Sequence, residues 1–176
     1  MNGDVKLESK RIKMKIKSVR YDVEESLFSK IFADVCDIDG EESDEDGELQ
    51  FSDGEEIELS TEGVMNIDGE KVELVYEESE ITGMQGSKTS VYFENSNEGF
   101  VSMLRSGAVS TSLLFEKGKR HHCVYNTPIM PFEICVKTLK VVNNILTDGT
   151  LFLDYIIEIR GAQAERTKFE LSLVEI

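Results

Sequence analysis

Hydrophobic and polar residues alternate strictly over many short segments of this chain. In the first of them, RIKMKIK, the residues Ile12, Met14 and Ile16 alternate with lysines. A period of two is typical of a strand that buries one face. We interpret the lysine face as a solvated face paired with acidic residues of neighbouring strands, rather than as a phosphate-binding row.

The same alternation runs from residue 55 to the end of the chain. Its inward-phase residues are Ile57 and Leu59, Val72 to Tyr76, Val91 and Phe93, Val101 and Met103, Leu113 and Phe115, His122 and Val124, Ile134 and Val136, Leu151 to Ile159, and Phe169 to Leu173. Turn signals such as Asp68-Gly69 and Asp148-Gly149 separate these segments. Roughly eight to ten strands joined by short turns predict a single antiparallel barrel, because closure hides the sheet edges.

The segment 22–56 interrupts the alternation and is predicted to be an insertion after the first strand. Apolar residues recur there at helical spacing, which predicts a short amphipathic helix over 23–35. They are Leu27, Phe28, Ile31, Phe32 and Val35. So short a helix is marginal alone, so we expect its apolar side to pack on an open barrel end. An acidic, mobile loop follows.

The acidic loop comes close to the pattern of a calcium-binding loop. With Gly47 at the sharp turn, Glu42, Asp44 and Asp46 take the first ligand positions and Asp53 the last. The pattern normally starts with Asp and ends with a bidentate Glu, and no helix is predicted to follow. We therefore favour a solvated acidic loop over a specific calcium site.

Composition fits one domain, 1–176, with 40% apolar residues and a net charge of -16. The insertion holds 15 acidic residues and one basic residue, Lys30, a balance of -14. This charge argues against nucleic acid as a partner, and no apolar run is long enough for a membrane helix. Three cysteines without CxxC spacing suit a reducing compartment, so we expect a cytoplasmic protein.

Catalytic and cofactor signatures give no lead to a reaction. The chain has no GxSxG, HExxH, Walker or GxGxxG motif, and it has only two histidines. The residues Gly83-Met84-Gln85-Gly86 follow a strand without opening a helix, which indicates a turn. A binding protein without cofactor or catalytic residues is therefore favoured over an enzyme.

The stretch KGKRHHCVYNTPIMPFEIC is predicted to form a hairpin with its loop at 127–131. This loop would place Asn126 opposite Phe132 and Cys123 opposite Cys135. Cys123, Cys135 and His121 would then share the outer face, and His122 would point inward. Two thiols and an imidazole could supply three ligands of a zinc site. We favour reduced cysteines without metal, because a fourth ligand is not evident.

Polar residues in the inward phase of the strands give the candidate binding site. They are Tyr76, Glu78, Arg105, His122 and Tyr155. Two alternatives remain open for them. Glu78 and Arg105 could form a structural ion pair in a filled barrel, or Arg105 could hold the anionic head of a ligand.

Three stretches resemble the YwiB-like bacterial family of unknown function. They are YEESEITGMQG, LRSGAVSTSLLFEKGKRHHCVYNTP and GTLFLDYIIEI. The resemblance covers the first strand and then Glu55 to the end, and it implies a calycin-like (lipocalin-like) β-barrel but no reaction. This chain departs from the family pattern in its insertion, and at Met130-Pro131, where the family tends to place a glycine soon after Thr-Pro.

Two classes of function are compatible with these observations. The barrel could bind a small apolar or anionic amphiphilic molecule in its interior. Alternatively, the acidic insertion could dock a basic surface of a protein partner. The sequence does not determine the oligomeric state.

Overall fold

The computed structural model describes residues 7–23, 54–159 and 164–175. This part of the chain consists of ten strands and a single three-residue 3-10 helix. The elements are β1 (Glu8–Val23), β2 (Glu55–Asp68), β3 (Lys71–Glu77), η1 (Glu80–Thr82), β4 (Ser87–Glu94), β5 (Asn97–Gly107), β6 (Thr111–Glu116), β7 (Arg120–Asn126), β8 (Pro131–Asn144), β9 (Thr150–Ile159) and β10 (Ala164–Glu175). The predicted all-β fold is therefore confirmed.

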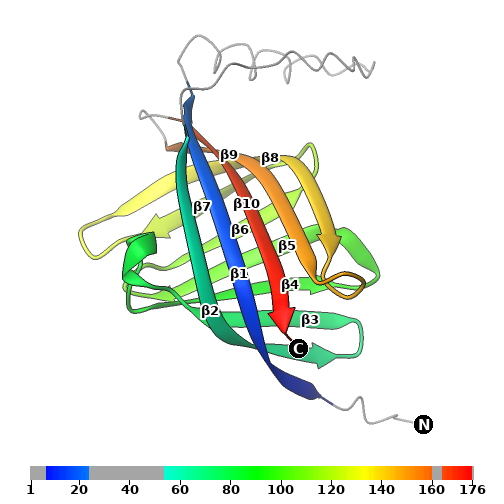
Figure 1. Ribbon diagram of the computed structural model, residues 1–176. Coiled ribbons are helices and arrows are strands. Elements are labelled where there is room, and N and C mark those ends of the chain that lie inside the picture. Colours follow the sequence, from blue (N-terminus) through cyan, green and yellow to red (C-terminus); the bar gives the residue numbers. More distant parts are fainter. Residues whose placement is uncertain (1–6, 24–53, 160–163, 176) are drawn as a thin grey trace, which may run out of the picture.

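The strands form one antiparallel sheet in which neighbours along the chain are neighbours in space. The order is β6-β5-β4-β3-β2-β1-β10-β9-β8-β7, so the pairing of β1 with β10 joins the two ends of the chain. The sheet curls until β4, β5 and β6 cross behind β1 and β10 (Figure 1). At the remaining seam, the backbones of Ser110 and Asn126 exchange hydrogen bonds of 3.0 and 2.8 Å. The result is the nearly closed barrel that the meander pattern predicted.

Strand alternation separates a buried inner face from a solvated outer face. On β1, Ile12, Met14 and Ile16 point into the core, as predicted. On the outer face Lys15 pairs with Glu58, and Lys17 Nζ lies 3.0 Å from Glu56 on β2. The lysine row thus pairs with acidic side chains of the neighbouring strand, as the sequence suggested.

The barrel interior holds one continuous apolar core. Its largest fully buried side chains are Phe93, Phe115, Met14, Leu74, Met103, Leu113, Leu151, Leu153, Leu171, Val72 and Val91. Most of them come from alternate positions of the strands. Glycine is required at position 63, where β2 begins to pair with β3, because a Cβ there would clash with the carbonyl oxygen of Val75.

The ends of β1 and β2 differ from the predicted limits of the insertion. The structure extends β1 to Val23 and begins β2 at Glu55, so the predicted segment 22–56 overlaps both strands. The predicted helix 23–35 lies almost wholly outside the described residues. The same is true of the acidic loop with the calcium-like pattern at Glu42, Asp44, Asp46 and Asp53.

Candidate functional site

A cavity of about 610 Å³ opens at one end of the barrel, where β1 ends and β2 begins. Its apolar walls are formed by Ile16, Ile57, Leu59, Met84, Val109, Tyr125, Phe132, Ile134, Ile157, Ile159 and Phe169. Its polar lining comes from Ser18, Arg20, Asp22, Tyr76, Glu78, Thr82, Arg105, Thr127, Tyr155, Glu165 and Thr167. The volume lies within the roughly 300–1,000 Å³ common among small-molecule sites.

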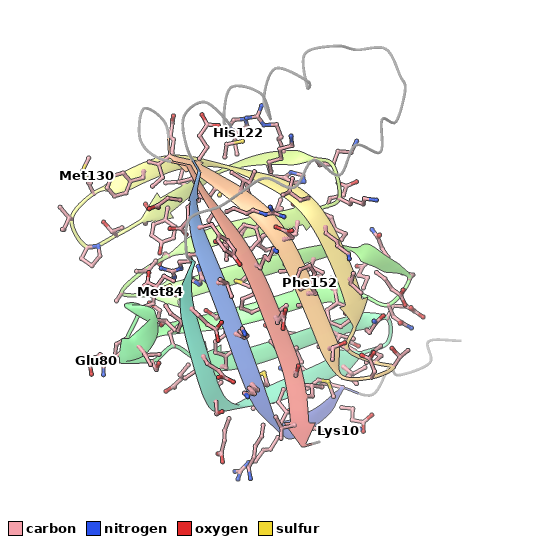
Figure 2. All side chains as sticks on the ribbon, turned by 45° about the horizontal axis from the view of Figure 1, so that its top comes forward. Lys10, Glu80, Met84, His122, Met130 and Phe152 are labelled. Atoms are coloured by element: carbon pink, nitrogen blue, oxygen red, sulfur yellow. The ribbon has the colours of Figure 1, made fainter. Side chains whose placement is uncertain are left out.

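Loops from two parts of the chain border this cavity. Met84 follows η1, and the loop after β7 contributes Thr127 and Pro128. The two regions touch where the hydroxyl of Tyr125 lies 3.8 Å from the sulfur of Met84. In Figure 2, Met84 and Met130 of the β7–β8 hairpin lie on the same side of the barrel.

An ion pair between β5 and the end of β3 lies deep in the cavity. Arg105 Nε lies 3.5 Å from Glu78 Oε1, and the Glu78 side chain is only 2% exposed. Thr89 on β4 donates a 2.5 Å hydrogen bond to the same carboxylate oxygen. The three residues come together because β3, β4 and β5 are consecutive neighbours, with Thr89 opposite both Tyr76 and Arg105.

The guanidinium of Arg105 is incompletely hydrogen bonded. Its buried Nε finds no hydrogen-bond acceptor among the residues that the structure describes, and its 3.5 Å contact with Glu78 is an ion pair without a hydrogen bond. Within the described part of the chain, its Nη2 donates only to the thioether of Met103, at 3.4 Å, and a thioether is a weak acceptor. A buried N–H without an acceptor is unfavourable, so this group favours an incoming oxygen.

Two tyrosines complete the polar base of the cavity. Burial raises the pKa of Tyr76, and the nearby carboxylate of Glu78 adds to the effect, although Arg105 opposes it. Burial also raises the pKa of Tyr155, against the opposing charges of Arg105 and Arg20. Both phenols therefore keep their protons at neutral pH and can donate hydrogen bonds.

Half-buried apolar side chains lie between the polar base of the cavity and the charged residues of its mouth. Tyr76 and Tyr155 at the base are 3% and 4% exposed. Leu59, Phe132 and Ile157 are half-buried and pack against the core nearer the opening. An amphipathic molecule with its polar group at the base could pack its apolar part against these side chains, inside the ion pair of Arg20 with Glu165 at the mouth.

The structure brings four of the five predicted site residues to this cavity. Tyr76, Glu78, Arg105 and Tyr155 all line it. The inward placement of His122 is wrong: its side chain is exposed on the outer face of β7 and borders a separate outer hollow. Figure 2 shows His122 at the barrel's outer edge.

The error at His122 comes from the length of one loop. The structure pairs Asn126 with Pro131, so the β7–β8 loop has four residues where the sequence suggested five. Cys123 consequently faces Ile134, and Cys135 faces His122. A shift of one residue turns every side chain of a strand to the other face. Tyr125 therefore joins the cavity wall in place of His122.

The corrected register also separates the two cysteines. Cys123 packs against the core, whereas Cys135 alternates with the inward-facing Ile134 and Val136 and so lies on the other face. The arrangement required for the zinc alternative, with Cys123, Cys135 and His121 on one outer face, does not occur. No group of three or more metal-ligating side chains occurs among the described residues.

Sequence reasoning missed several polar residues at the cavity mouth. Arg20 on β1 and Glu165 on β10 form an ion pair of 3.8 Å, and Thr167 donates to Glu165 at 3.4 Å. The sequence did hold a signal for these residues, because the inward positions of β1 change from apolar Ile16 to polar Ser18 and Arg20. A change from apolar to polar residues in one phase marks where a strand leaves the core.

Comparison with known proteins places the chain in a family without assigning it an activity. It is similar to the crystal structure of the ywiB protein from Bacillus subtilis, with 20% identity, a TM-score of 0.59, and coverage of 94% of this chain and 92% of that chain. A search of curated proteins found no match. No helix in the described segments has the length and apolar character needed to cross a membrane. The model of the DUF1934 family, a domain of unknown function, matches residues 36–171, and the chain therefore belongs to this family.

Proposed function

We propose that this barrel binds a small molecule, either apolar or an anionic amphiphile, in the cavity at its open end. The observation that carries the proposal is the under-bonded guanidinium of Arg105, which lines a cavity with largely apolar walls. A ligand oxygen at this position would supply the missing acceptor. The half-buried apolar side chains toward the mouth would cover the apolar part of the ligand.

The competing explanation is a purely structural role for the polar residues. The 3.5 Å contact between Glu78 and Arg105 supports it in part, because the two charges compensate each other. A structural pair needs no cavity, however, and the interior beside this pair retains about 610 Å³. The unfilled volume favours a binding role.

A binding role is also favoured over catalysis. Neither histidine lines the cavity, and its polar base consists of an ion pair, two protonated phenols and threonines. The protein-interaction alternative, in which the acidic insertion docks a basic surface, depends on residues outside the described segments and stays a prediction of the sequence.

Ligand binding should raise the unfolding temperature of the full chain. A series of ten-carbon amphiphiles differing in head group is the probe. A ligand at about 100 times its dissociation constant stabilises the folded state by about 2.7 kcal/mol. We expect a saturable increase with at least one member, measured by differential scanning calorimetry.

Two tryptophan variants test whether the increase in unfolding temperature comes from binding in the cavity. Leu59→Trp adds bulk to the cavity wall and should abolish the temperature increase. Leu104→Trp places the same side chain on the exposed side of β5 and should preserve it. Equal responses of both variants, or no response of the wild type to any probe, would contradict the proposed function.

A further inference from the structure

We infer that the cavity selects an amphiphile whose polar group is an uncharged hydrogen-bond acceptor, such as a primary amide, over one with a carboxylate. We also infer that Glu78 imposes this selection. The inference rests on the proposed function and replaces the anionic head group considered there with an uncharged one. It follows from the balance of charges and hydrogen-bond donors around the base of the cavity.

The charged side chains that line the cavity leave no net positive charge. Two are basic, Arg20 and Arg105, and three are acidic, Asp22, Glu78 and Glu165. At the mouth Arg20 pairs with Glu165, and at the base Arg105 pairs with Glu78. Among the described residues of the lining, a carboxylate entering this space would meet no cation that lacks a counter-ion.

The base of the cavity is nevertheless rich in hydrogen-bond donors. Arg105 offers its Nε–H, which has no acceptor among the described residues, and the weakly bonded N–H of Nη2. The buried hydroxyls of Tyr76 and Tyr155 lie in the same lining. An amide or ketone oxygen can accept from these donors without bringing a charge into a poorly solvated site.

Glu78 distinguishes the two kinds of head group. Any oxygen that accepts from Arg105 Nε must lie close to the Glu78 carboxylate, which is 3.5 Å from that nitrogen and 2% exposed. Like charges at such separations repel more strongly beside a buried carboxylate than in bulk water. A neutral acceptor experiences no such repulsion, so Glu78 acts as a specificity-determining residue.

The test compares decanamide with decanoate, which share the length of their carbon chain, by isothermal titration calorimetry at pH 8 and below micelle-forming concentrations. We expect the wild-type protein to bind decanamide at least about tenfold more tightly than decanoate. This factor corresponds to the repulsion of one like-charge contact at a partly buried site. Glu78→Gln retains an acceptor for the Thr89 hydroxyl and removes the charge. It should improve the affinity for decanoate by about tenfold and change that for decanamide little.

Glu77→Gln is the matched control. Glu77 is the neighbour of Glu78 and lies on the exposed face of β3, so this substitution changes the net charge by the same amount outside the cavity. It should leave the preference for decanamide over decanoate unchanged. Tighter binding of decanoate than of decanamide by the wild type would overturn the inference while leaving the proposed function intact, and this comparison needs no variant. An unchanged preference in folded Glu78→Gln would refute the role of Glu78. Absence of binding by both probes in the wild type would instead count against the proposed function.

Discussion

Phe115→Ala is expected to lower the free energy of unfolding by about 3–5 kcal/mol, the usual cost of removing a fully buried aromatic side chain. Phe115 is completely buried on the inner face of β6. Its ring centroid lies 4.8 Å from that of Tyr155, so it also supports the base of the cavity. Chemical denaturation followed by circular dichroism gives the free energy directly.

Phe152→Ala provides the comparison for this substitution. Phe152 alternates with the core residues Leu151 and Leu153 on β9, so it lies on the outer face, where it is half-buried (Figure 2). Its ring faces Lys140, whose Nζ is 5.7 Å from the centroid. We expect a loss of only about 1 kcal/mol. Equal losses for the two variants would show that the inner face of the barrel is not the main core.

Arg105→Met should destabilise the protein by about 3–5 kcal/mol, because it leaves the buried carboxylate of Glu78 without its counter-charge. Thr89 would remain as a hydrogen-bond donor to Glu78, but a hydroxyl does not neutralise a charge. The double variant with Glu78→Gln should recover most of the loss. The free energies of the wild type, the two single variants and the double variant form a cycle that isolates the energy of the pair.

A matched cation on the solvated face serves as the control for Arg105. Lys17 pairs with Glu56 at 3.0 Å, and both side chains are well exposed. Lys17→Met should therefore leave the unfolding free energy nearly unchanged. A small loss for Arg105→Met, or no recovery in the double variant, would show that the buried pair contributes little and that Glu78 tolerates burial alone.

The barrel itself could be predicted from the sequence because each strand repeats the same alternation of apolar and polar residues. Residues such as Ile12, Met14 and Ile16 alternate with charged ones, and this pattern fits only a strand with one buried face. The residues at the base of the cavity could be predicted from the same alternation. Glu78 continues the inward series of Leu74 and Tyr76, and the structure keeps it inside.

The orientation of β7 in the hairpin around Cys123 could not be predicted in this way. β7 carries partly apolar side chains on both faces, with Tyr125 on one and Val124 on the other, so its pattern does not fix the phase. The choice of which β7 residues point inward was therefore inferred from the length of the loop. An error of one residue in that length assigned the wrong residues to the inner face. Thr127 explains the shorter loop, because its hydroxyl and backbone bond Met130 and close a four-residue turn.

The unfilled volume of the barrel could not be predicted from the sequence at all. Whether inward side chains meet or leave a space depends on the curvature of the sheet and on where each strand leaves the core. The sequence indicated that Arg105 and Glu78 point inward, but it could not show that Arg105 Nε lacks a hydrogen-bond acceptor among the described residues. The ligand hypothesis therefore depends chiefly on observations that only a structure supplies.

The account is tested most directly by an isotope-filtered nuclear Overhauser experiment on ¹³C-labelled protein with unlabelled decanamide or decanoate, whichever binds more tightly. We predict contacts from the hydrogens beside the ligand's polar group to the rings of Tyr76 and Tyr155, which line the base of the cavity. We predict contacts from its terminal methyl group to Leu59 and Ile157, which are half-buried toward the mouth. Contacts in the reverse order, or contacts only to outer-face side chains such as Val124, would contradict the account.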